Sequence, residues 1–341
     1  MQAQMNTCET PGHEQWVVVD VQVPGDYQVV VGSRLATGRS LSRVRPPAGR
    51  VLPGAIGKVA RTGKPLMFLS SAIHNVSYQV QATPILGPLG DIYAVACALA
   101  PDGRPLPEPP PSGGWEWDIT TRMGRATRQL FDVTRTPPGL RKAQFSMVEY
   151  AGSLTVPARF SAANLWARMT KATNDELVFD TLLGEGEHPY LVCGRPEFDG
   201  DTPVAFRGVT VDLTDVLPMA AEEPTADDLL VAVLSHSDRP LAVVDLADLH
   251  LMHWLTPPAA GVQWPPDPYL PEIVHPVDRS TLEAHTWRDA AGAAVADPSP
   301  IVVRLPAACG GWATVELDAR RYMHEDSGAS RVVVSVRVMG E

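Results

Sequence analysis

The chain has 341 residues, of which 45% are hydrophobic and 20% are charged, and its formal net charge is −11. A chain of this length is too long for a single typical domain, so we expect two or three domains. The composition is that of an ordinary soluble globular protein. The negative charge argues against a nucleic-acid groove as the main function, and we expect no nucleic-acid partner.

The N-terminal stretch MQAQMNTCETPGHEQ lacks the basic and apolar regions of a signal peptide. No apolar run in the chain approaches the roughly 20 residues that are needed to span a bilayer. These two observations predict a cytoplasmic protein with no membrane span.

In the first part of the chain, GAIGKVARTGKP, from Gly54 to Pro65, predicts a helix that ends at Gly63 before a strand begins. The stretch does not fit the phosphate-loop consensus, because five residues separate Gly57 from Gly63 and proline follows Lys64. Together with the later YQVQATPILGPLGDIYAVACALA, it resembles the middle and end of a GAF domain.

Two breaks divide the chain into three predicted domains, residues 1–100, 115–217 and 228–341. The first break, PDGRPLPEPPPSGG over 101–114, predicts a semi-rigid linker without helix or central strand, because proline lacks the N–H donor and fixes φ. The second break, over 218–227, precedes a predicted helix that Thr225 caps.

The middle domain opens with WEWDITTRMGRATRQLFDV, which predicts two strands and a short helical turn. A helix is predicted over ARFSAANLWARMTKA, because its apolar side chains recur near helical spacing: Phe160, Leu165, Trp166 and Met169. Two strands joined by the turn at 199–202 then predict a hairpin. In the second of these strands, alternation places one apolar set on a single face: Val209, Val211 and Leu213.

The order of strands, helices and a strand hairpin predicts an α+β fold, in which helices pack on one face of an antiparallel sheet. The third domain repeats this order. Its last strand carries valines on one face, Val332, Val334, Val336 and Val338, and we expect the opposite face to be in water.

The middle domain resembles a PAS domain with its C-terminal hairpin, on the strength of WEWD, LFDV and GRPEFDGDTPVAFRGVTVDLTDV. The third domain resembles a second PAS domain through PLAVVDLADLHLMHWLTPP, VHPVDRSTLEAHTWRDA and GGWATVELDARRYMHEDSGASRVVVSVRVM. As a whole, the chain resembles actinobacterial proteins that combine a GAF-like domain with two PAS-like domains and have no output module. The resemblance implies three GAF/PAS-like sheets that act as sensors or docking units.

Tryptophan is the side chain that we expect to fill the predicted PAS cores, because large rings pack well between a curved sheet and its helices. The tryptophans in those units are Trp117, Trp166, Trp254, Trp287 and Trp312. If a small apolar ligand binds, Trp166 and Trp287 on the central helices are the predicted pocket residues. Complete filling by these rings would instead leave no room for a ligand.

No residue pattern supports catalysis or a resident cofactor. The histidines His253, His275 and His285 are conceivable haem ligands, but a lone histidine is more often an ordinary surface or core residue. The cysteine motif that attaches flavin in light-sensing PAS domains is absent, and so are hydrolase and metalloprotease motifs. Four cysteines, Cys8, Cys97, Cys193 and Cys309, have no metal-knuckle spacing, and we expect reduced thiols and no metal site.

These observations favour a cytosolic sensor or regulatory protein that binds a separate protein carrying the output function, either constitutively or in response to a small-molecule ligand. A homodimer is compatible with this prediction. We expect no enzymatic activity. Two alternatives stay open, namely an enzyme of unrecognised chemistry in the first domain and a structural adaptor that binds no ligand.

Overall fold

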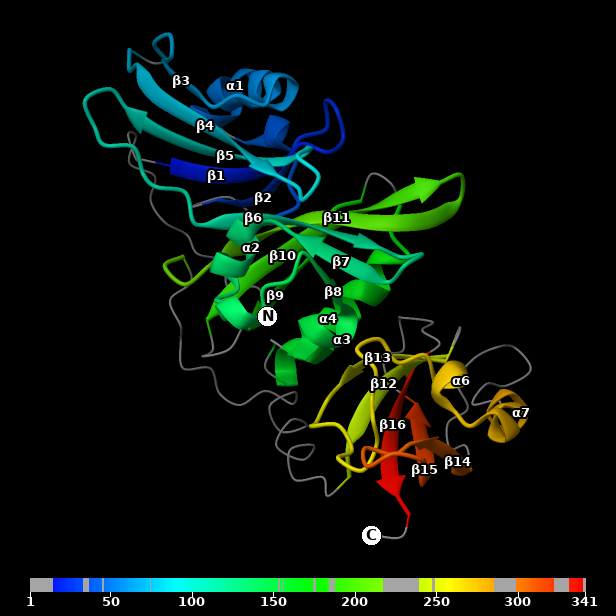
Figure 1. Ribbon diagram of the computed structural model, residues 1–341. Coiled ribbons are helices and arrows are strands. Elements are labelled where there is room, and N and C mark those ends of the chain that lie inside the picture. Colours follow the sequence, from blue (N-terminus) through cyan, green and yellow to red (C-terminus); the bar gives the residue numbers. More distant parts are fainter. Residues whose placement is uncertain are drawn as a thin grey trace.

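The computed structural model describes residues 15–32, 37–44, 46–73, 75–152, 154, 156–173, 176–183, 188–216, 239–246, 249–284, 299–321 and 331–339. Within these ranges the chain forms three antiparallel sheets of five, six and five strands (Figure 1). The predicted linker over 218–227 and the helix start at Thr225 lie outside the described residues.

The first sheet has the strand order β2-β1-β5-β4-β3. Its elements are β1 (Gln15–Asp20), β2 (Gln28–Gly32), α1 (Ala48–Thr62), β3 (Leu66–Leu69), β4 (Tyr78–Leu86) and β5 (Ile92–Pro101). Helix α1 ends as predicted at Gly63, which has a φ of +66° and donates its N–H to the Val59 carbonyl at 2.8 Å. This left-handed C-cap is the reason for glycine at the position, and the phosphate-loop reading is not needed.

The middle sheet has the order β8-β7-β6-β11-β10-β9. The elements are β6 (Ser112–Asp118), β7 (Met123–Ala126), α2 (Arg128–Val133), β8 (Gln144–Ser146), α3 (Met147–Gly152), α4 (Val156–Met169), β9 (Val178–Leu183), β10 (Pro189–Asp199) and β11 (Thr202–Asp212). The predicted helix and the predicted hairpin are both confirmed as α4 and as the β10–β11 pair.

The predicted linker over 101–114 needs a correction at both ends. Strand β5 includes Pro101, and β6 begins at Ser112 as a central strand between β7 and β11. Gly113 and Gly114 therefore belong to the sheet. Residues 102–111, which hold the other prolines, form no helix or strand, and the last proline, Pro111, precedes the start of β6 at Ser112.

The third sheet has the order β13-β12-β16-β15-β14. The elements are β12 (Leu241–Asp245), β13 (His250–Trp254), α6 (Leu270–Ile273), α7 (Arg279–Ala284), β14 (Ile301–Pro306), β15 (Trp312–Arg321) and β16 (Arg331–Val338). Apart from the extra edge strand β8, all three sheets thus share one order of strands. Each has helices on one face, which confirms the predicted α+β class with three GAF/PAS-like sheets.

The outer faces of the first two sheets, away from their own helices, pack against each other. The shared core contains Val18, Val30, Val31, Ile85, Tyr93 and Ala94 from the first domain and Leu177, Leu191, Cys193, Val209, Val211 and Leu213 from the middle domain. The alternation read from β11 is confirmed, since Val209, Val211 and Leu213 are all buried together. What buries them is the neighbouring domain.

A buried ion pair joins the same two domains. The Arg195 Nε donates to the Asp20 carboxylate at 2.7 Å, and the two side chains are only 3% and 2% exposed. Nearby, the Tyr93 hydroxyl donates to Glu116 Oε2 at 2.9 Å. Arg207 lies beside Glu116 on the outer face of the middle sheet, at 3.4 Å. The Asp20–Arg195 and Tyr93–Glu116 contacts therefore link the two domains through polar groups.

The helices of the middle domain separate its sheet from the outer face of the third sheet, as Figure 1 shows for α3, α4, β12 and β13. Hydrogen bonds between described residues cross this boundary. Ser146 Oγ donates to the Pro266 carbonyl at 2.7 Å, and Arg159 Nη1 donates to the Trp254 carbonyl at 2.8 Å.

The prediction that β16 has one face in water is wrong in part. Val332, Val334 and Val336 are buried in the main core of the third domain, as expected. On the opposite face, however, Val333 packs with Leu241, Val243 and Leu255 in a second small core. Only the end of that face is in solvent, because the middle-domain helices lie close to β12 and β13.

Candidate ligand-binding site

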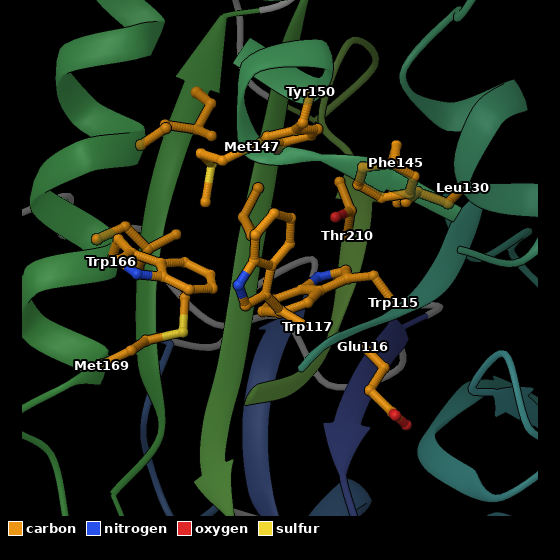
Figure 2. A pocket seen from close by; sticks show the side chains of 14 residues that line it. Trp115, Glu116, Trp117, Leu130, Phe145, Met147, Tyr150, Trp166, Met169 and Thr210 are labelled. Atoms are coloured by element: carbon orange, nitrogen blue, oxygen red, sulfur yellow. The ribbon is translucent and has the colours of Figure 1, made fainter. Parts of the chain in front are cut away.

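A cavity lies inside the middle domain, between the inner face of its sheet and the helices α3 and α4 (Figure 2). Its volume is about 50 Å³. We call it the aromatic cavity, after its lining of tryptophan, phenylalanine, tyrosine and methionine side chains. Its lining includes Trp115, Glu116, Trp117, Phe145, Met147, Tyr150, Ala162, Trp166, Met169 and Thr210.

The alternation of β6 places Trp115 and Trp117 on the inner face of the sheet and Glu116 between them on the outer face. Figure 2 shows both indoles directed toward the helices and the Glu116 carboxylate directed away from them. The Glu116 side chain instead accepts from Tyr93 of the first domain. One strand thus supplies the cavity wall on one side and an interdomain contact on the other.

Glycines make room for these rings. Trp115 lies opposite Gly208 in the β6–β11 pair, and Gly208 lies opposite Gly194 in the next pair. A Cβ at Gly194 would come within 2.8 Å of the Trp115 ring, and one at Gly208 within 2.5 Å of the ring and 2.0 Å of the Cys193 carbonyl oxygen. The inner face of the sheet is therefore flat under Trp115, because these two strands carry no side chain there.

Replacement of Gly208 by alanine should destabilise the middle domain by about 1–3 kcal/mol, because the new methyl group has to displace both backbone and ring. Gly54→Ala is the matched control. Gly54 lies inside α1, a Cβ there meets nothing within 4 Å, and alanine should raise stability by about 0.5–1 kcal/mol. Urea unfolding of both variants measures the contrast, and a neutral Gly208→Ala would show that the packing under Trp115 is loose.

The rings that surround the cavity pack edge to face. The Trp117 and Trp166 centroids are 5.0 Å apart with planes at 83°, and those of Trp166 and Phe206 are 4.7 Å apart, also at 83°. Phe145 lies 6.3 Å from Trp117. Such T-shaped contacts stabilise the cluster beyond the burial of its area. They also hold Trp166 between the sheet and α4.

Two polar groups border this apolar space, and the first of them has no protein partner among the described residues. One is the Trp115 indole N–H, in a side chain that is 7% exposed. The other is the hydroxyl of Thr210, a residue that is 2% exposed and lies in the cavity wall. Tyr150 also lines the cavity, and burial raises the pKa of its phenol to about 12, so this group is neutral. The Trp115 indole, the Thr210 hydroxyl and the Tyr150 phenol are therefore all uncharged.

Three lining residues, Met147, Ala162 and Trp166, also line a second, smaller space on the far side of α3 and α4. The opposite wall of that space consists of Val243, Met252 and His253 from the third domain. We call Met147, Ala162 and Trp166 the shared wall and the second space the interdomain gap. The shared wall is thus a single layer of side chains between the aromatic cavity and the third domain.

Of the two pocket residues predicted from sequence, Trp166 lines the aromatic cavity, whereas Trp287 lies outside the described residues. Trp117 and Trp254 are buried as expected. The prediction that Trp312 fills the core is wrong. Its side chain is 48% exposed and packs against the His275 ring with centroids 4.6 Å apart, because it is the first residue of β15, at the end of the sheet.

Neither described haem candidate reaches the aromatic cavity. His253 borders the interdomain gap, and His275 caps the turn that precedes α7, where its Nδ1 accepts from the Val277 N–H at 3.2 Å. His285 lies outside the described residues. Next to His275, Asp278 accepts a bidentate contact from Arg304, which lowers the pKa of Asp278 to about 2. Both residues therefore have structural roles.

Cys97 and Cys193 are buried and free, and burial raises the pKa of both thiols well above its ordinary value. Cys309 is exposed, while Cys8 lies outside the described residues. In the part of the chain that the structure describes, no group of three or more His, Cys, Asp or Glu side chains could hold a metal ion. No described helix is both long enough and apolar enough to cross a lipid bilayer.

Sequence reasoning missed Trp115, Met147 and Thr210 as cavity residues. A signal for Trp115 was present, because WEW on a strand places two tryptophans on one face, and the glycines opposite it lie in the predicted hairpin. Met147 belongs to α3, a short helix without a clear sequence pattern. Thr210 reads as a polar residue on a wet face, and only the tertiary structure shows that both faces of β11 are covered.

Fold and site together define a three-domain α+β protein with GAF/PAS-like sheets and an aromatic cavity in the middle domain. No family model and no curated protein matches the sequence. Among solved structures, an uncharacterized protein from Mycobacterium tuberculosis is similar over 96% of this chain and 97% of its own, with a TM-score of 0.67 and 18% identity. This likeness shows that the two chains share their fold over nearly their whole length.

Two further solved structures match with much lower TM-scores. An RNA-binding light-oxygen-voltage receptor matches over 67% of this chain and 95% of its own, with 13% identity and a TM-score of 0.28. The sensor region of a sensor histidine kinase matches over 60% and 86%, with 12% identity and a TM-score of 0.26. With such TM-scores, neither likeness adds to the conclusions about this chain. The GAF assignment of the first domain and an actinobacterial origin stay predictions.

Proposed function

We propose that the chain is a sensor or regulatory protein in which a small molecule in the aromatic cavity changes the docking of the third domain. The observation that carries this proposal is the shared wall. Met147, Ala162 and Trp166 contact the cavity on one side and the interdomain gap on the other. A ligand that moves these side chains therefore changes the surface on which the third domain rests.

The size of the cavity explains why a ligand would move the shared wall. Its volume of about 50 Å³ is well below the about 150 Å³ of an engineered cavity that holds benzene. A ring-sized ligand therefore has to displace side chains. The sheet side resists this, because the rings rest on glycine backbone there and the first domain covers the outer face. Met147 is flexible and belongs to the helical side, so the wall yields first.

The output would leave the chain through protein contacts. The first two domains are held together by a common core and by the Asp20–Arg195 ion pair, whereas the middle and third domains are joined by the packing of α3 on β13 and by hydrogen bonds from Ser146 and Arg159. A shift between two docking states of the third domain would expose or cover a surface for a separate output protein or for a second copy of the chain. This mechanism needs no catalytic step.

Xenon tests the coupling without knowledge of the natural ligand, because it enters dry apolar cavities. The full chain, labelled with ¹³C at the methionine methyl groups, is placed under xenon pressure. We expect the methyl signals of Met147 and Met169 to shift by direct contact. The Met252 signal should also shift, although Met252 lies across the shared wall in the third domain. Met67 is the control, because its side chain is 68% exposed on the first domain.

Two outcomes would contradict the proposal. A shift of Met147 and Met169 without Met252 would show that the cavity fills without affecting the third domain. No shift at any of the three residues would show that the cavity does not open, which favours the structural adaptor that binds no ligand. Native mass spectrometry of the purified chain, with an absorbance spectrum, would then identify any retained molecule elsewhere.

A further inference from the structure

We infer that the ligand of the aromatic cavity is a neutral, single-ring aromatic molecule with one hydrogen-bonding oxygen, of which phenol is the simplest example. This inference rests on the proposed function and names the chemical class that the same cavity would take. Three properties of its described lining carry it: an unpartnered indole N–H with a hydroxyl nearby, the absence of a facing charge and a small volume.

The first polar group is the indole N–H of Trp115. This nitrogen can only donate a hydrogen bond, and it has no acceptor among the described residues although its side chain is 93% buried. Figure 2 shows the Trp115 ring extending into the group of lining side chains. A buried donor of this kind is normally satisfied by the protein, by an ordered water or by a ligand. An acceptor atom in the cavity would satisfy it.

The second polar group is the Thr210 hydroxyl, which can both donate and accept. In the β6–β11 pair, Trp115 lies opposite Gly208, and Thr210 follows two residues later on the same inner face, opposite Gly113. Such diagonal neighbours have Cα atoms about 7–8 Å apart. One small ligand can therefore contact both groups, and a phenolic oxygen could accept from the indole while it donates to the hydroxyl.

Among the described residues of its lining, no charge faces the cavity that could compensate an anionic ligand. Glu116 is the one acidic residue of its lining, and its carboxylate is bound on the outer face by Tyr93, away from the cavity. Bringing a carboxylate group between Trp117 and Trp166 would leave it buried and unpaired, which is strongly unfavourable. The same rings favour another aromatic ring through edge-to-face packing, and a fused ring system would have to displace more of the shared wall than a single ring.

The experiment compares phenol, benzene and benzoate with the full chain at pH 7.5. Affinity is measured by calorimetry, and the indole N–H proton of Trp115 is followed by NMR. We expect phenol to bind about three- to tenfold more tightly than benzene, as one net hydrogen bond allows, and benzoate not to bind. Phenol should also shift the Trp115 indole proton downfield.

Thr210→Val removes the hydroxyl at nearly constant volume. This variant should bind phenol about three- to tenfold more weakly and benzene with unchanged affinity, while Thr210→Ser should restore the affinity for phenol. Thr181→Val on β9 is the matched control, because Thr181 is exposed and should not affect either probe. Unchanged benzene binding by Thr210→Val shows that a loss of phenol binding in this variant does not reflect misfolding.

The inference is overturned if benzene binds as well as phenol and Thr210→Val changes neither, since a buried water would then satisfy the indole. Tighter binding of benzoate would overturn it as well. If no probe binds but xenon still shifts Met252, the ligand class is wrong and the sensor proposal stands. If xenon also fails to reach Met147 and Met169, the sensor proposal itself is wrong.

Discussion

Replacing Asp20 with alanine is expected to lower the free energy of unfolding by about 3–5 kcal/mol, because the change leaves the Arg195 guanidinium buried without its counter-ion. Both side chains are almost fully buried between the first two domains, and their atoms approach to 2.7 Å. Burial raises the pKa of Asp20, while the Arg195 charge and its hydrogen bonds act against that rise. Stability is measured by urea unfolding of the full chain.

Two further variants separate the buried charge from other effects. The double variant Asp20→Leu with Arg195→Met should recover most of the loss, since replacing both partners by apolar groups removes the unpaired charge. Asp180→Ala is the control. The side chains of Asp180 and its partner Arg168 are 36% and 52% exposed, so their ion pair should contribute less than about 1 kcal/mol to stability. If Asp20→Ala costs no more than Asp180→Ala, the first two domains are not held together by this pair.

The second large effect is expected for Trp117→Ala, which should reduce the free energy of unfolding by about 3–5 kcal/mol. Trp117 is 5% exposed, and its ring supports Trp166 and Phe145. Its loss enlarges the aromatic cavity, so the variant should also bind larger apolar probes than the parent chain. Urea unfolding and near-ultraviolet circular dichroism measure the loss of stability and of fixed aromatic packing.

Trp312→Ala makes the same chemical change in the third domain at a half-exposed site. Its cost should stay below about 1.5 kcal/mol, because much of the ring is already in water. Equal losses for the two variants would show that the rings around the aromatic cavity do not form a rigid core. The comparison also distinguishes tryptophans that the sequence analysis had grouped together.

Local structure followed from the sequence where one residue type decides it. Gly63 ends α1 because a left-handed C-cap suits glycine, and the turn at 199–202 accepts the dihedral angles of a hairpin. Alternation correctly identified the buried faces of β11 and β16. The same reasoning identified Trp166 on a helix that faces the sheet. Each of these features depends on interactions within a few residues or on one periodic pattern.

The sequence could not predict which surface covers each element. Alternation shows that a strand buries one face, but it does not identify the partner, and a polar residue such as Thr210 gives no sign that its face is closed too. Only the tertiary structure places Asp20 beside Arg195, 175 residues further along the chain. It alone brings Met147 and Trp166 between the cavity and the third domain. Sequence therefore determined the strands, turns and buried faces, whereas docking between domains decided the site, because that docking depends on complementarity of distant surfaces.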